Sequence, residues 1–131
     1  MRILGILFAA GLAVAASTAH ADEIDTCVKA AAAADHVKVS EVDRDTCVCA
    51  TKQLHLTLRP SDYDLHEKML EIIAGGADEK TFNKQMSDIM LQRGMKQTDV
   101  DAFLARSHKA ENAAQIKCNT SPLLTPALPA H

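Results

Sequence analysis

The stretch Asp43-Arg44-Asp45-Thr46-Cys47-Val48-Cys49-Ala50 contains two cysteines that are two residues apart. Residues at this spacing in a helix differ by about 200° around its axis, so we expect Cys47 and Cys49 to point to opposite sides. A bond between them would close a strained ring, and each is therefore expected to pair with a cysteine elsewhere. The chain has 4 cysteines, an even number that predicts two disulfides in an oxidising compartment.

Cys27 and Cys118 are the available partners, and they leave two pairings to consider. If the segments before and after Lys38 fold back on one another, Cys27 lies eleven residues before the turn and Cys49 eleven residues after it. We therefore expect Cys27 to bond to Cys49, and Cys47 to bond to Cys118. The alternative, Cys27 with Cys47 and Cys49 with Cys118, stays open because it depends on the rotation of each helix.

Around the cysteines, apolar residues recur at three- and four-residue spacing, which is typical of helices. The expected helices cover residues 22–35, 40–60, 61–75, 78–93 and 98–118, with a turn at 36–39. The expected N-cap residues of three of them are Ser40, Ser61 and Thr98, each followed three residues later by an aspartate. Residues 54–58 alternate like a strand but have no partner strand, so they are assigned to a helix. The predicted fold class is all-α, a small bundle of about five short helices joined by two disulfides.

The first residues have the features of a secretory signal peptide. Met1-Arg2 is followed by an apolar run over residues 3–16 and by an Ala-x-Ala pattern that ends at Ala21. We expect cleavage after Ala21, a periplasmic or secreted location, and no membrane insertion of the mature chain. The predicted organisation is a signal peptide at 1–21, a disulfide-bonded helical domain at 22–118 and a disordered, proline-containing tail at 119–131.

The composition excludes two classes of partner. The chain of 131 residues has a formal net charge of -3, which is unsuited to a nucleic-acid partner. Aromatic residues make up only 3% of the chain, too few for stacking on sugars or unpaired bases.

Four residues, His66, Met69, Met86 and Met90, form the basis of an alternative function, a periplasmic copper or other metal site. Met86 and Met90 lie one helical turn apart, and thioether sulfur is a ligand that Cu(I) prefers. We favour a core position for both, because they share an apolar stripe with Phe82. His66 is expected to be a half-buried surface residue, and no cofactor is expected.

A second alternative is a thiol-disulfide redox protein that uses Cys47-x-Cys49. The neighbouring acids Asp43 and Asp45 disfavour a thiolate at this pair, and the Cys-x-x-Cys spacing of thioredoxin-like enzymes is absent from the sequence. Nucleophile-elbow, zinc-protease and phosphate-loop motifs are also absent from the sequence. We therefore expect a protein without catalytic activity.

The remaining interpretation is a module that binds another exported protein, as an inhibitor, an immunity protein or a chaperone does. A chaperone that acts in acid needs groups that gain charge as the pH falls. The histidines considered for that role are His36, His55, His66 and His108.

Overall fold

The computed structural model describes residues 13–118, with side chains from residue 21 onward. Its elements are α1 (Ala13–Asp35), the 3-10 turn η1 (Val39–Glu41), α2 (Arg44–Thr57), α3 (Pro60–Ala74), α4 (Glu79–Gln92) and α5 (Gln97–Cys118). The all-α prediction is confirmed for these residues. The predicted tail and residues 1–12 of the predicted signal peptide lie outside the described part. Within residues 13–118, every helix is too short or too polar to cross a membrane.

The helix α2 begins later than the sequence predicts. Asp43 is its N-cap, and the Asp43 carboxylate accepts a hydrogen bond of 3.0 Å from the backbone N–H of Asp45. Ser40 lies instead in η1, where the N–H of Lys38 donates to the Glu41 carboxylate at 2.7 Å. The predicted Ser40 cap is therefore wrong, because residues 38–41 form a turn of their own.

Two other predicted N-caps are also wrong. Pro60 is the first residue of α3, a position where its fixed φ angle suits a helix and its missing N–H costs nothing, so Ser61 lies inside the helix. Helix α5 starts at Gln97, and the Asp99 carboxylate accepts from the N–H of Lys96 at 2.8 Å. Thr98 is therefore also a residue of the first turn.

The helix ends follow the predicted turns. Gly76 and Gly94 have positive φ angles of 75° and 66° after α3 and α4, a conformation that glycine adopts without strain. After α1 the same role falls to His36, with φ of 54°. The N–H of Val37 then donates to the carbonyl of Ala32 at 3.0 Å, which closes the end of the helix.

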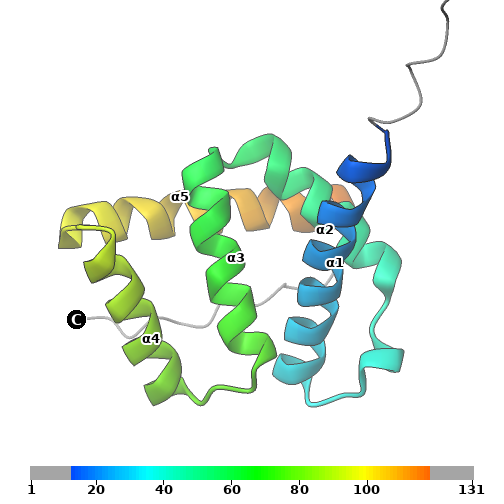
Figure 1. Cartoon of the computed structure of the whole chain (residues 1–131), viewed down its shortest axis with the longest axis horizontal. Coiled ribbons are helices and arrows are strands. Elements are labelled where there is room, and N and C mark those ends of the chain that lie inside the picture. Colours follow the sequence, from blue (N-terminus) through cyan, green and yellow to red (C-terminus); the bar gives the residue numbers. More distant parts are fainter. Residues whose placement is uncertain (1–12, 119–131) are drawn as a thin grey trace, which may run out of the picture.

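Figure 1 shows α3 between α1 and α4, with α5 crossing behind α3. Helix α1 packs against α2 and α3, and α2 packs against α5. The face of α1 buried in the molecule is rich in alanine, with Ala30, Ala31 and Ala32 all buried. Alanine buries little apolar area, so this contact brings helices close together with a small hydrophobic gain.

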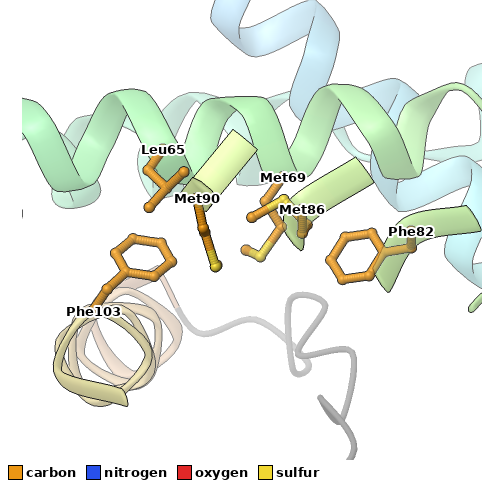
Figure 2. Close-up of a cluster of buried hydrophobic side chains, with 6 residues drawn as sticks. All are labelled: Leu65, Met69, Phe82, Met86, Met90 and Phe103. Carbon is orange, nitrogen blue, oxygen red and sulfur yellow. The ribbon is translucent and has the colours of Figure 1, made fainter. Parts of the chain in front are cut away.

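The main core lies between α3, α4 and the first turns of α5. Its six buried side chains are Leu65, Met69, Phe82, Met86, Met90 and Phe103 (Figure 2). A second cluster, between α2, α3 and α5, consists of Leu54, Leu58, Tyr63 and Ala110. Leu54 and Leu58 are both buried while Leu56 is exposed, and the segment that alternates in sequence is helical as far as Thr57, with Leu58 as the extended C-cap.

The disulfides are Cys27–Cys47 and Cys49–Cys118, with Cα–Cα distances of 5.8 and 5.9 Å. The expected pairing is therefore wrong, and the alternative pairing is the one formed. Cys47 and Cys49 differ in level by only about 3 Å along a helix, so the distance from the turn does not discriminate between them. The rotation of α2 decides, and it turns Cys47 toward α1 and Cys49 toward α5. The prediction that the two point to different neighbours is confirmed.

Candidate functional site

A buried polar pair joins α3 to α5. The Nε2 atom of His66 lies 2.9 Å from Oε1 of Glu111, at hydrogen-bond distance. His66 is 2% exposed and Glu111 is 5% exposed. The expectation of a half-buried surface position for His66 is thus wrong. Two polar side chains can be buried at this depth only because each provides the other with a hydrogen-bond partner.

A second polar contact joins the same two helices one turn earlier along α3. The Asp62 carboxylate is buried and accepts from Nε and Nη2 of Arg106, at 2.7 and 3.0 Å. It also accepts from Nε of Arg59 at 3.3 Å. The hydrogen bonds from Arg106 hold the pKa of Asp62 below its usual value, although burial acts in the opposite direction.

Tyr63, the residue after Asp62, is part of a third group of polar residues. Its ring stacks on His55 of α2, with centroids 3.8 Å apart, and its hydroxyl donates to Oε1 of Glu67 at 3.3 Å. His55 Nε2 lies 2.7 Å from Oε2 of Glu23 on α1. Burial, together with the charge of Glu23, raises the pKa of Glu67, and burial also raises the pKa of Tyr63.

A small cavity lies where α1, α2, α3 and α5 meet, beside the His66–Glu111 pair. Its polar lining residues are Thr51, His66, Glu67 and Glu111. The cavity has a volume of about 20 Å³, which is room for one water molecule and too little for an organic substrate.

Two buried side-chain atoms near this contact, Nδ1 of His66 and Oγ of Ser107, have no hydrogen-bond partner. Ser107 lies one turn before Glu111 on α5. No hydrogen bond joins Ser107 to His66, so these three residues do not form the connected nucleophile, base and acid that acyl transfer requires.

The residues of the alternative metal site do not form one set. Met69, Met86 and Met90 lie together between Phe82 and Phe103 (Figure 2), whereas His66 pairs with Glu111. The predicted core position of Met86 and Met90 is confirmed. Among residues 13–118, no group of three or more His, Cys, Asp or Glu side chains is arranged to hold a metal ion.

The cysteine pair of the alternative redox motif is divided between two disulfides, and the chain's four cysteines are all bonded. Of the four histidines considered as acid sensors, only His66 is buried; His36, His55 and His108 lie at the surface. The acid-sensing histidine set is therefore not gathered in one place.

Comparison with known proteins identifies no relative. No family model matches the chain, and no curated protein or solved structure is similar to it. The candidate site is therefore interpreted from its own geometry.

The partners of His66 and Asp62 were not predicted from the sequence, although a signal for one of them is present. Glu111 follows Ser107 and precedes Ala114 on the apolar stripe of α5, so its position already indicates burial. A buried acid on one helix and a histidine on the apolar stripe of another are natural partners. Arg106 gave no such signal, because its long side chain reaches Asp62 from a half-exposed position.

Proposed function

We propose that this chain is an exported, non-catalytic, chaperone-like protein that binds other polypeptides when acid opens it. In this proposal the mature chain begins after Ala21 and works in the periplasm or outside the cell. The observation that carries the proposal is the ion pair between the buried carboxylate of Asp62 and the half-exposed Arg106, which joins α3 to a part of the molecule held by disulfides. A contact between helices that depends on a carboxylate can be opened by acid, which favours the chaperone-like role over an inhibitor or an immunity protein.

The helices fall into two groups according to how they are held. Disulfides join α1 to α2 and α2 to α5, so these three helices form a covalent frame. Helices α3 and α4 contain no cysteine, so apart from the backbone connections to α2 and α5 they are held to this frame by non-covalent contacts. Disulfide exchange needs a thiolate, so the frame persists in acid while ion pairs do not. Acid can therefore separate α3 and α4 from a frame that stays folded.

Asp62 gives the direction of the acid effect. Because the fold lowers its pKa, the carboxylate stabilises the folded state above the unfolded value of about 3.9. This contribution is lost as the pH falls toward the lower folded value. The groups that face the carboxylate are the guanidinium groups of Arg59, just before α3, and of Arg106 on α5. Once Asp62 is protonated, Arg106 loses this anionic partner.

Glu67 acts in the opposite direction. Because the fold raises its pKa, its charge destabilises the folded state at neutral pH, and protonation relieves this cost as the pH falls. The two effects together predict a protein that stays closed in mild acid and opens only below about pH 4.

The surface uncovered by opening suits a binder of varied sequences. Met69 on α3 and Met86 and Met90 on α4 share the main core with Phe103 of α5, so they lose its cover when α3 and α4 separate from the frame. Methionine side chains are flexible and polarisable, and they adapt to apolar partners of different shape. Unfolded polypeptides with apolar segments are therefore the proposed clients.

The test is aggregation of an acid-sensitive enzyme at about pH 3, with and without an excess of this protein, compared with the same assay at pH 7. Binding of 1-anilinonaphthalene-8-sulfonate reports the uncovered apolar surface. We expect protection and dye binding only in acid, and at a higher pH for Asp62→Asn than for the wild type. Asp88→Asn is the matched control, because Asp88 pairs with Lys84 on an exposed face. If the protein shows no dye binding and no protection at about pH 3, the proposal is refuted.

A further inference from the structure

We propose that the Cys49–Cys118 disulfide is a site of thiol–disulfide exchange with an exported dithiol oxidoreductase, and that Cys27–Cys47 is not. The two bonds share the segment Cys47-Val48-Cys49, yet they differ in their surroundings. The exchange involves no titration of Asp62, so a protein without an acid response could still undergo it.

The first bond is shielded by the frame. Cys27 is 7% exposed and Cys47 is 1% exposed, and both pack against Val28 and the half-buried Ile24 and Val42. An attacking sulfur must approach in line with the S–S bond, and the burial of both cysteines restricts that approach. Access controls the rate of exchange as strongly as thiol chemistry does.

The second bond lies at an open edge. Cys49 and Cys118 are both half-buried, and their neighbours Val48 and Lys117 are exposed. Cys49 lies within α2 next to the buried Ala50, whereas Ile116 and Lys117, the two residues before Cys118, are both exposed. We therefore take the Cys118 sulfur to be the more accessible of the two.

The exchange is balanced as follows. A thiolate of the oxidoreductase attacks Sγ of Cys118, a new mixed disulfide forms, and the bond to Cys49 breaks with Cys49 leaving as a thiolate. Attack at Cys118 is favoured because access to the sulfur limits the rate of exchange. The second thiol of the oxidoreductase then attacks its own sulfur in the mixed disulfide. Cys118 leaves, both cysteines take up a proton, and the oxidoreductase is left with a disulfide.

The released cysteine does not scramble the buried bond. Cys47 and Cys49 point to opposite sides of α2, so the thiolate of Cys49 does not reach the Cys27–Cys47 sulfurs. What changes is the end of α5. Its last turns carry Glu111 and Ala114, which line the cavity beside His66. Reduction thus loosens one wall of this cavity and leaves the α1–α2 pair joined.

The first test measures which bond is reduced. The oxidised protein is treated with dithiothreitol for increasing times, free thiols are alkylated, and mass spectrometry locates each adduct. We expect Cys49 and Cys118 to be modified at least about tenfold faster than Cys27 and Cys47. Equal rates, or earlier modification of Cys27 and Cys47, would overturn the proposal.

The second test identifies the attacked sulfur. A reduced thioredoxin-type oxidoreductase with its resolving cysteine replaced by serine is expected to become linked to Cys118. An adduct at another cysteine would overturn the proposal, as would no adduct under conditions where dithiothreitol reduces the bond. In a Cys49→Ser, Cys118→Ser double variant, hydrogen exchange should accelerate over residues 108–118 and stay unchanged over 22–35. Unchanged exchange over 108–118 would contradict the loosening of α5.

Discussion

His66 on α3 and Glu111 on α5 are 45 positions apart in the sequence, and their side chains lie 2.9 Å apart inside the protein. Both are almost fully buried. The pair joins two helices that no disulfide connects directly. A buried polar pair of this kind stabilises the folded state less than its short distance suggests, because both groups are removed from water. Removing one partner nevertheless lowers the stability strongly, since the other polar group is then buried without a hydrogen-bond partner.

The His66–Glu111 pair is expected to show this asymmetry. Glu111→Ala should destabilise the protein by about 3 kcal/mol, measured by urea unfolding at pH 7. The double variant His66→Leu with Glu111→Leu should recover most of this loss, because two apolar side chains replace the pair. Glu71→Ala is the control, since Glu71 pairs with Lys68 at the surface and should cost less than about 1 kcal/mol. Equal effects of Glu111→Ala and Glu71→Ala would show that the buried pair does not contribute as described.

Asp62→Asn should lower stability at neutral pH and have a smaller effect in strong acid. At pH 7 we expect a loss of about 2 kcal/mol, because an amide has one acceptor oxygen in place of two and no charge, so the two-point ion pair with Arg106 is lost. Below the folded pKa of Asp62 the wild-type carboxyl is also neutral, so the difference between the two proteins should shrink as the pH falls below about 4. The free energy of unfolding, measured as a function of pH, checks this. A constant difference across the pH range would mean that the charge of Asp62 is not the cause.

The methionines of the main core should be replaceable by leucine. Met86→Leu with Met90→Leu conserves volume and should cost less than about 1.5 kcal/mol for each substitution. Titration with Cu(I) against a competing chelator, on the wild type and on the double variant, checks whether these residues are ligands. A tight site in the wild type that disappears in the variant would make copper binding the leading function.

The disulfide pairing is testable on the purified protein. Alkylation of the denatured, unreduced chain should add no adduct, because all four cysteines are bonded. Ordinary peptide mapping does not distinguish the two pairings, since Cys47 and Cys49 remain on one peptide. Partial reduction followed by cyanylation and cleavage at the modified cysteines does, and should assign Cys27–Cys47 and Cys49–Cys118. A Cys27–Cys49 bond would contradict the structure.

The helices were predictable because their signals are local. Glycines after α3 and α4, and the Asp78 carboxylate that accepts from the N–H of Thr81 at 2.8 Å, mark boundaries that neighbouring residues determine. The start of α2 was missed where two local solutions compete, since Ser40 and Asp43 are both good N-caps. Ser40 lies inside the turn at 38–41, where Glu41 accepts from the N–H of Lys38, and Asp43 is left to begin the helix.

The candidate site was not predictable to the same degree, because it depends on how helices rotate and cross. The pairing of Cys27 with Cys47 and the contact of Asp62 with Arg106 are both set by rotation about helix axes. A single sequence gives the stripe on which a residue lies, and it does not give the opposing residue. His66 and Glu111 were each on an apolar stripe, but the crossing of α3 and α5 that joins them emerges only from the folded chain.

If acid separates α3 from the disulfide-bonded frame, the fluorescence of Tyr63 reports this separation directly. Tyr63 is the one tyrosine of a chain without tryptophan, and it lies buried between α2, α3 and α5. Quenching of its fluorescence by acrylamide should be weak at pH 7 and strong at about pH 3, while the far-ultraviolet circular dichroism keeps most of its helical signal. The transition should move to higher pH in Asp62→Asn and stay in place in Asp88→Asn. A tyrosine that remains shielded at about pH 3 would contradict the account.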